Sequence, residues 1–193
     1  MRKMFWGLLL MVAYLRVSLG GGTVNLLPDF AGTLLVLSGI RELNGESPSL
    51  DTARTMLIAS TVVFAIGWVR GLVGLYIPGV DAILYWTMLI LKVYIPYRCI
   101  VGVRELEQVR ETDLHSDSLM KCWKLYCVAM PVSLLSSVLS QVTPALAYVS
   151  LLTLLMALGA YIAYLIYFYK AGTAYAQSMP PAMEIAEGNT YDT

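Results

Sequence analysis

The sequence has few charged residues. Asp, Glu, Lys and Arg make up 13% of the 193 residues, whereas hydrophobic residues make up 58%. A soluble domain carries about 25% charged residues, so this chain has too few charges to cover the surface of a soluble globule. The composition therefore excludes an ordinary soluble enzyme, a disordered chain and a nucleic-acid-binding protein with a basic face. It indicates an integral membrane protein.

Residues and motifs that build metal, disulfide and catalytic sites are also scarce. His115 is the only histidine, and the three cysteines, an odd number, contain no C-x-x-C pair. The sequence has no Walker loop, no dinucleotide-binding fingerprint, no H-E-x-x-H and no G-x-S-x-G. We therefore predict no metal, no cofactor and no catalytic residues, and we favour a protein that is not an enzyme.

Six apolar runs are the dominant feature of the sequence. A helix needs about 20 apolar residues to cross a hydrocarbon core about 30 Å thick. The predicted fold is an all-α integral membrane bundle of six transmembrane helices, at residues 4–19, 24–40, 56–77, 80–103, 125–142 and 145–169. The first two runs are short, so they need flanking residues or a locally thinner bilayer to span it.

The connections between these runs predict three helical hairpins. The three connections on one side are very short, and each contains one proline that fits the first turn of the returning helix: Pro28, Pro78 and Pro144. On the other side, residues 104–124 form a predicted amphipathic segment, which begins as an extension of the fourth helix with the apolar stripe Val103, Leu106 and Val109. Residues 1–170 are thus the transmembrane domain, and residues 171–193 a predicted disordered cytoplasmic tail.

The N-terminal run allows a second interpretation. Residues 1–20 begin with two cations, Arg2 and Lys3, followed by an apolar stretch and a small-residue end, which is also typical of a cleaved signal peptide. Cleavage would leave five spans with the remaining topology unchanged.

The distribution of cations predicts the orientation. Ten of the thirteen Lys and Arg residues fall on the side that carries both termini, and none falls in the three short connections. The other three, Arg16, Arg70 and Lys92, lie within predicted spans. Because Lys and Arg are enriched in cytoplasmic loops, both termini are predicted to be cytoplasmic.

One short box resembles a known family. The run Asn25-Leu26-Leu27-Pro28-Asp29-Phe30-Ala31-Gly32 is similar to the N-[IL]-L-P-D-F-x-G pattern of small uncharacterised multi-spanning membrane proteins of Firmicutes. Ala31 and Thr33 depart from the larger residues usual in that family. The resemblance implies a bacterial cytoplasmic membrane protein and implies no activity.

Five charged residues within or beside the spans are candidates for substrate or lipid binding: Arg16, Asp29, Arg70, Asp81 and Lys92. Charges inside a membrane are costly and normally have a partner. The first four map to the outer half of the membrane, which predicts ion pairs between hairpins; an anion or lipid-headgroup site is the alternative. Lys92 maps near the centre of its span. No Asp or Glu maps to the centre of any span, which argues against a proton relay of carboxylates.

These observations leave three hypotheses for function. The leading one is a non-catalytic accessory or interaction protein of the membrane. The alternative is a small transporter or channel component that uses Arg70 and Lys92, helped by the close-packing pattern Gly67-x-x-x-Gly71. The third is a lipid-headgroup-binding protein or enzyme at the outer face, acting through Asp29, Asp81 and the arginines. The predicted partners are the lipid bilayer and a membrane protein or a second copy of this chain, not nucleic acid.

Overall fold

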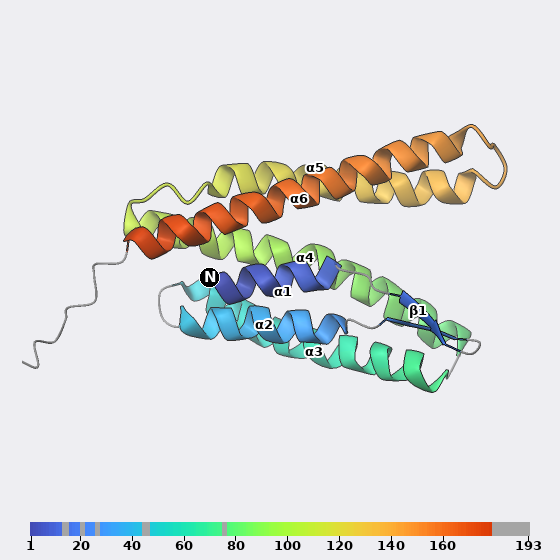
Figure 1. Ribbon diagram of the computed structural model, residues 1–193, viewed down its shortest axis with the longest axis horizontal. Helices are drawn as coiled ribbons and strands as arrows, with labels where there is room; N and C mark the ends of the chain where they lie inside the picture. The colour runs from blue at the N-terminus through green and yellow to red at the C-terminus, as the bar shows by residue number, and fades with distance from the viewer. Residues whose placement is uncertain (13–15, 20–21, 26–27, 44–46, 75–76, 179–193) are drawn as a thin grey trace, which may run out of the picture.

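The computed structural model describes residues 1–12, 16–19, 22–25, 28–43, 47–74 and 77–178. Within these residues the chain forms six helices and one two-stranded sheet (Figure 1). In chain order they are α1 (Arg2–Val12), β1 (Arg16–Leu19), β2 (Gly22–Asn25), α2 (Asp29–Glu42), α3 (Pro48–Val73), α4 (Pro78–Arg110), α5 (Ser116–Leu139) and α6 (Leu146–Ser178).

Four helices of the described chain, α3 to α6, are long and apolar enough to cross a membrane. At about 1.5 Å per residue, the 24 residues of α5 extend about 36 Å and the 33 residues of α4 about 50 Å. The 11 residues of α1 and 14 of α2 extend only about 16 and 21 Å. A membrane protein is therefore supported with four candidate spans, and α1 and α2 are too short to be two more.

The prediction was wrong for the first two apolar runs. Helix α1 ends at Val12, and β1 pairs antiparallel with β2, with Val17 opposite Val24. The predicted spans 4–19 and 24–40 continued as helix through these strands. Glycine is a poor helix former, and β-branched residues favour strands. The Gly20-Gly21-Gly22 run and its Val and Thr neighbours therefore favour a hairpin over a helix.

The other helices extend beyond the predicted boundaries. Helix α3 begins at Pro48 rather than residue 56, because Ser47 caps it by accepting a hydrogen bond from the Leu50 N–H. Helix α4 runs to Arg110, so the first part of the predicted segment 104–124 belongs to the same helix. Of the apolar stripe predicted there, Val103 and Leu106 are buried but Val109 is exposed.

Helix α6 continues to Ser178, so the first eight residues of the predicted tail are helical. Ala171 and Tyr175 extend the buried face of Tyr164 and Phe168 at helical spacing. The Arg110 guanidinium also lies over the Tyr175 ring, with its Cζ atom 5.7 Å from the ring centroid. The remainder of the predicted tail, 179–193, lies outside the described residues.

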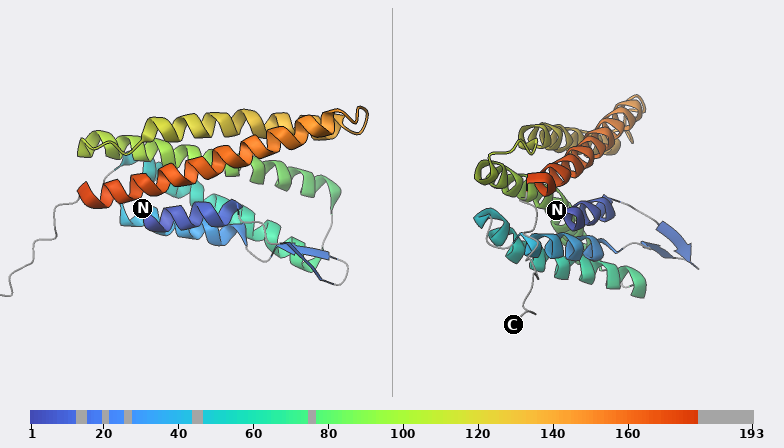
Figure 2. Two further views of the ribbon diagram at one scale, coloured as in Figure 1. Left: turned by 45° about the horizontal axis from the view of Figure 1, so that its top comes forward. Right: turned by 60° about the vertical axis from the view of Figure 1, so that its left-hand side comes forward.

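The helices form two layers (Figures 1 and 2). Helices α5 and α6 make an antiparallel pair on one side, and α1 to α4 make the other layer. Helix α1 contacts both α2 and α6, with the Phe5 and Tyr169 rings 5.4 Å apart. We call the end of the bundle that carries Arg2 and Ser178 the terminal end, and the end that carries Val73 and Leu139 the far end.

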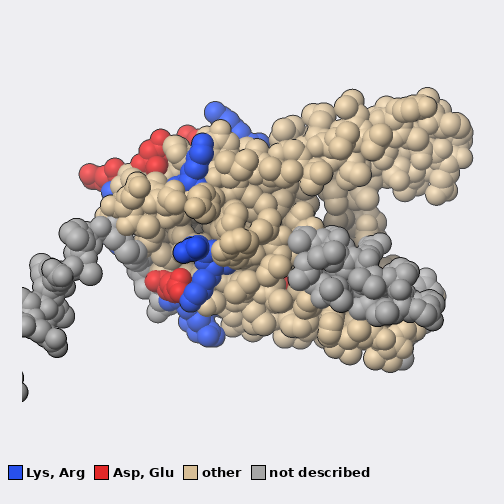
Figure 3. Space-filling view, viewed as in Figure 1, with Lys and Arg blue, Asp and Glu red and all other residues tan. Residues whose placement is uncertain are grey.

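The two ends differ in packing and charge. Large fully buried side chains such as Leu106, Leu119 and Phe168 lie toward the terminal end. Toward the far end the α5–α6 pair separates from α4, and the space-filling view shows a deep notch between them (Figure 3). The same view shows Lys, Arg, Asp and Glu gathered at the terminal end. The cation asymmetry predicted from the sequence thus has a structural counterpart.

Helices α1 and α2 pack with their backbones close together. A Cβ on Gly7 would lie 2.5 Å from the Gly32 carbonyl oxygen, and one on Gly39 would lie 2.8 Å from the Met4 nitrogen. Close approach at small residues is typical of helix pairs in membranes. By contrast, a Cβ on Gly71 would contact nothing within 4 Å. Close packing by glycine therefore occurs at α1–α2 and not at Gly71.

Replacing Gly32 with valine tests this contact. We expect Gly32→Val to lower the free energy of unfolding by about 1–3 kcal/mol, because neither backbone can move away without repacking. Thermal unfolding of the purified protein in detergent measures the change. Gly71→Val is the matched control and should unfold near the wild-type temperature. Equal effects of the two substitutions would contradict the close α1–α2 contact.

Candidate functional site

The Lys92 ammonium and the Asp29 carboxylate form an ion pair inside the bundle. Nζ of Lys92 lies 2.9 Å from Oδ2 of Asp29, and the side chains are only 15% and 14% exposed. Asp29 is the first residue of α2, where the positive end of the helix dipole also favours a carboxylate. Lys92 is fourteen residues into α4, about 21 Å from its start. An anion and a cation therefore meet deep between the helices.

This pair corrects one sequence interpretation. Asp29 does not lie beside the outer connection, because α2 starts within the bundle and runs back to Glu42, which pairs with Lys3 at the terminal end. The error arose from treating 24–40 as a complete span. Helices α3 to α6 carry Asp and Glu only near their ends, so the carboxylate beside Lys92 comes from the first residue of α2.

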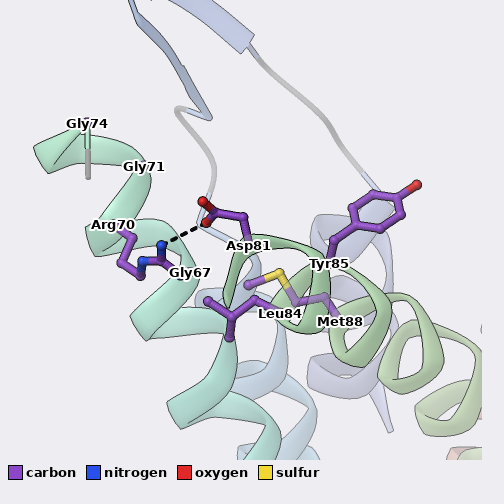
Figure 4. Close-up of a pocket in the computed structure, with 8 residues that line it drawn as sticks. All are labelled: Gly67, Arg70, Gly71, Gly74, Asp81, Leu84, Tyr85 and Met88. Atoms are coloured by element: carbon purple, nitrogen blue, oxygen red, sulfur yellow. Dashed lines mark ion pairs between the residues drawn. The ribbon is translucent and has the colours of Figure 1, made fainter. Parts of the chain in front are cut away.

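Arg70 and Asp81 form a second ion pair, close to the far end. Nη2 of Arg70 lies 2.9 Å from Oδ1 of Asp81, and Oδ2 of Asp81 accepts a hydrogen bond of 2.8 Å from the Ile77 N–H (Figure 4). The carboxylate therefore joins the end of α3 to the start of α4. The sequence predicted ion pairs between hairpins, whereas this pair lies within one hairpin, between α3 and α4. The side chain of Arg16 lies outside the described part of the structure, so its predicted ion pairing stays a prediction.

Three proline positions predicted as turns lie at or near helix starts. Pro28 directly precedes α2, Pro78 is the first residue of α4, and Pro144 lies two residues before α6. The Pro28 carbonyl accepts from the Ala31 N–H, and the Pro144 carbonyl from the Ala147 N–H.

One face of α4 connects the two ion pairs. Asp81, Tyr85, Met88 and Lys92 are spaced by four, three and four residues, which places them on one side of the helix. A cavity of about 330 Å³ lies between Arg70, Asp81, Tyr85 and Met88, where the small residues of α3 leave room (Figure 4). A second cavity, of about 360 Å³, contains Tyr85, Met88 and Lys92 in its wall. The two cavities share Tyr85 and Met88, so they form a series along α4.

The bundle is tightly packed on the terminal side of Lys92. Ile95, Pro96 and Cys99 are buried. The Tyr164 hydroxyl donates a 3.3 Å hydrogen bond to the Pro96 carbonyl, and the Tyr161 hydroxyl donates a 3.0 Å bond to the Leu8 carbonyl. Pro96 has no N–H, so it interrupts the hydrogen bonding of α4 one turn beyond Lys92. The series of cavities thus ends at Lys92 and faces the far end.

The chain matches no protein-family model, no curated protein and no solved structure.

Chemistry at this site is limited to charge, hydroxyl and thioether groups. No three His, Cys, Asp or Glu side chains of the described residues come together as metal ligands. Sequence reasoning selected Lys92, Asp29, Arg70 and Asp81, but it missed Tyr85 and Met88. Their spacing from Asp81 and Lys92 was the available signal.

A double-mutant cycle tests the Lys92–Asp29 pair. We expect Asp29→Asn alone or Lys92→Met alone to destabilise the protein by about 3–5 kcal/mol, because each leaves one buried charge without its counter-ion. The double variant should recover most of the loss. Chemical unfolding in detergent measures all four proteins. Lys3→Met and Glu42→Gln form the control cycle for an exposed pair and should change stability little. Additive losses at Lys92 and Asp29 would show that the pair is not coupled.

Proposed function

We propose that the protein is a small transporter or channel component of the membrane. The observation that carries this proposal is that Lys92, which pairs with Asp29, also lies in the wall of a cavity between the helices. Ionisable groups inside a membrane are costly and commonly mark ion or substrate pathways. A structural pair alone needs no cavity beside it, whereas a pathway does.

The lengths along α4 support this interpretation. The cavities extend from Asp81 to Lys92, eleven residues or about 16 Å. From Lys92 to Arg98 is six further residues, or about 9 Å, and this stretch includes the buried Ile95 and Pro96. A short packed stretch of α4 therefore lies between the cavity beside Lys92 and Arg98, the next cation toward the terminal end. Transporters also place binding sites at the termini of short helices that lie inside the membrane. Helix α2 has its N-terminus at Asp29, inside the bundle.

The proposed topology has four spans, α3 to α6, rather than six. The segment α1–β1–β2–α2 inserts into the bundle without forming two further spans. Both termini are placed in the cytoplasm, because cations concentrate at the terminal end. We also propose that the protein lies in a bacterial cytoplasmic membrane. The N-L-L-P-D-F-A-G box further suggests that it is a member of the Firmicutes family described above.

A non-catalytic accessory or interaction protein is the second candidate. It is favoured by the ion pairing at both Arg70 and Lys92, because paired charges also serve to hold helices together. The lipid-headgroup or enzymatic hypothesis loses its main support: Asp29 and Asp81, its proposed acids, each face a cation within the bundle.

Cysteine accessibility distinguishes the two candidates. In a variant without Cys99, Cys122 and Cys127, Met88→Cys places a thiol between the two cavities. For a transporter we expect a membrane-impermeant, charged thiosulfonate to modify it from the far-end side of sealed vesicles and also from the terminal side, as access alternates. Modification from the far-end side alone would favour the accessory protein. Absence of modification from either side would contradict the pathway.

The proposed orientation has a separate test. With the native cysteines removed, Gly79→Cys lies at the far end and Asp117→Cys at the terminal end, and both positions are exposed. We expect an impermeant maleimide added to intact cells to label Gly79→Cys only, because Asp117 is placed in the cytoplasm. Labelling of Asp117→Cys from outside would reverse the topology.

A further inference from the structure

A groove separate from the charged cavities lies between α4 and α5. Its volume is about 570 Å³, and its walls include Trp86 and Val93 of α4 and Cys127, Pro131 and Leu139 of α5. Every lining side chain is apolar or a thiol. The groove thus differs from the cavity beside Lys92, which also borders α4 and α5 but contains a charged side chain.

Hydrogen bonds explain the shape of this groove. Ser133 and Ser150 exchange hydrogen bonds with each other's backbone carbonyls, at 3.2 and 3.1 Å, and so hold α5 to α6. Helix α4 contacts α5 at the end of the groove nearer the terminal end, where the Trp123 indole N–H donates a 3.0 Å hydrogen bond to the Val93 carbonyl. The Tyr97 ring lies 4.9 Å from the Trp123 ring. The two helices therefore meet at one end and separate toward the other.

The dimensions of the groove suit one hydrocarbon chain. From Cys127 to Leu139 it follows α5 for twelve residues, or about 18 Å. One leaflet contributes about 15 Å to the hydrocarbon core. A lipid chain lying along α5 would thus fill the groove from end to end.

Lys124 lies next to the groove, at the end of the groove nearer the terminal end of the bundle. Lys124, Cys127, Pro131, Leu134 and Val138 are spaced by three or four residues, so they form one stripe along α5. Lys124 is exposed, one turn beyond Cys127, and no described carboxylate forms an ion pair with it. An exposed lysine at the edge of an apolar groove, next to an interfacial tryptophan, is complementary to a lipid phosphate.

We propose that the α4–α5 groove binds an anionic phospholipid, with one acyl chain between Trp86 and Pro131 and its phosphate at Lys124. This site is independent of the Lys92–Asp29 cavity and of the proposed transport function. It accounts for the apolar groove and for the position of Lys124 with a single occupant.

The native thiol of Cys127 reports occupation of the groove. We would use Cys99→Ala/Cys122→Ala protein in a neutral detergent and measure alkylation of Cys127 by N-ethylmaleimide with intact-mass spectrometry. Phosphatidylglycerol should slow alkylation, and half-protection should need about fivefold less of it than of phosphatidylcholine with the same chains, since one lysine near a membrane surface contributes that preference for anionic lipid. Lys124→Gln should abolish the preference, and Lys124→Arg should restore it.

Lys170→Gln is the matched control, because Lys170 is an exposed cation on α6 and should leave the preference unchanged. Equal protection by the two lipids, or no protection by either, would overturn the proposal. An equal effect of Lys170→Gln and Lys124→Gln would assign the preference to the overall charge and would also overturn it. Thermal unfolding of each variant confirms that it is folded.

Discussion

The fold depends on the requirement that a charge inside a membrane bundle meets its counter-ion. Lys92 lies about 21 Å from the start of α4, too deep for its ammonium to reach either surface readily. Asp29 supplies the counter-ion at 2.9 Å. For this contact, α2 has to begin inside the bundle rather than at its edge. The short length of α2 is thus coupled to the position of one lysine on another helix.

The same requirement explains the unusual N-terminal unit. A helix that begins at Asp29 covers only part of a bilayer, and the chain before it forms the antiparallel β1–β2 pair instead of more helix. Helix α1 then packs against α2 through Gly7 and Gly32. Met4 and Leu8, both fully buried, join this pair to the core of the bundle. The unit is held by backbone proximity on one side and by the ion pair on the other.

The sequence predicted the features that depend on local composition. The apolar runs around residues 56–77, 80–103, 125–142 and 145–169 correspond to α3, α4, α5 and α6, because long apolar runs have few alternatives in a membrane. The sequence selected Arg70 and Asp81 for ion pairs between hairpins, but the two residues pair with each other across one short connection. The Lys92–Asp29 pair was not predictable, because it joins residues 63 positions apart and requires a short α2. The extension of α4 to Arg110 followed from its amphipathic pattern, whereas the end of α6 at Ser178 depends on packing against other helices, which no local pattern contains.

Helix α4 separates two environments that have opposite polarity. Asp81, Tyr85, Met88 and Lys92 face the cavities that contain the ion pairs, whereas Trp86, Leu89 and Val93 line the apolar groove against α5. Leu89 and Met130 lie in the walls of both the groove and the cavity beside Lys92, so only a thin apolar contact separates the two spaces. These two side chains therefore keep an apolar space and a charged space apart on one helix, and the low dielectric of their contact strengthens the Lys92–Asp29 attraction.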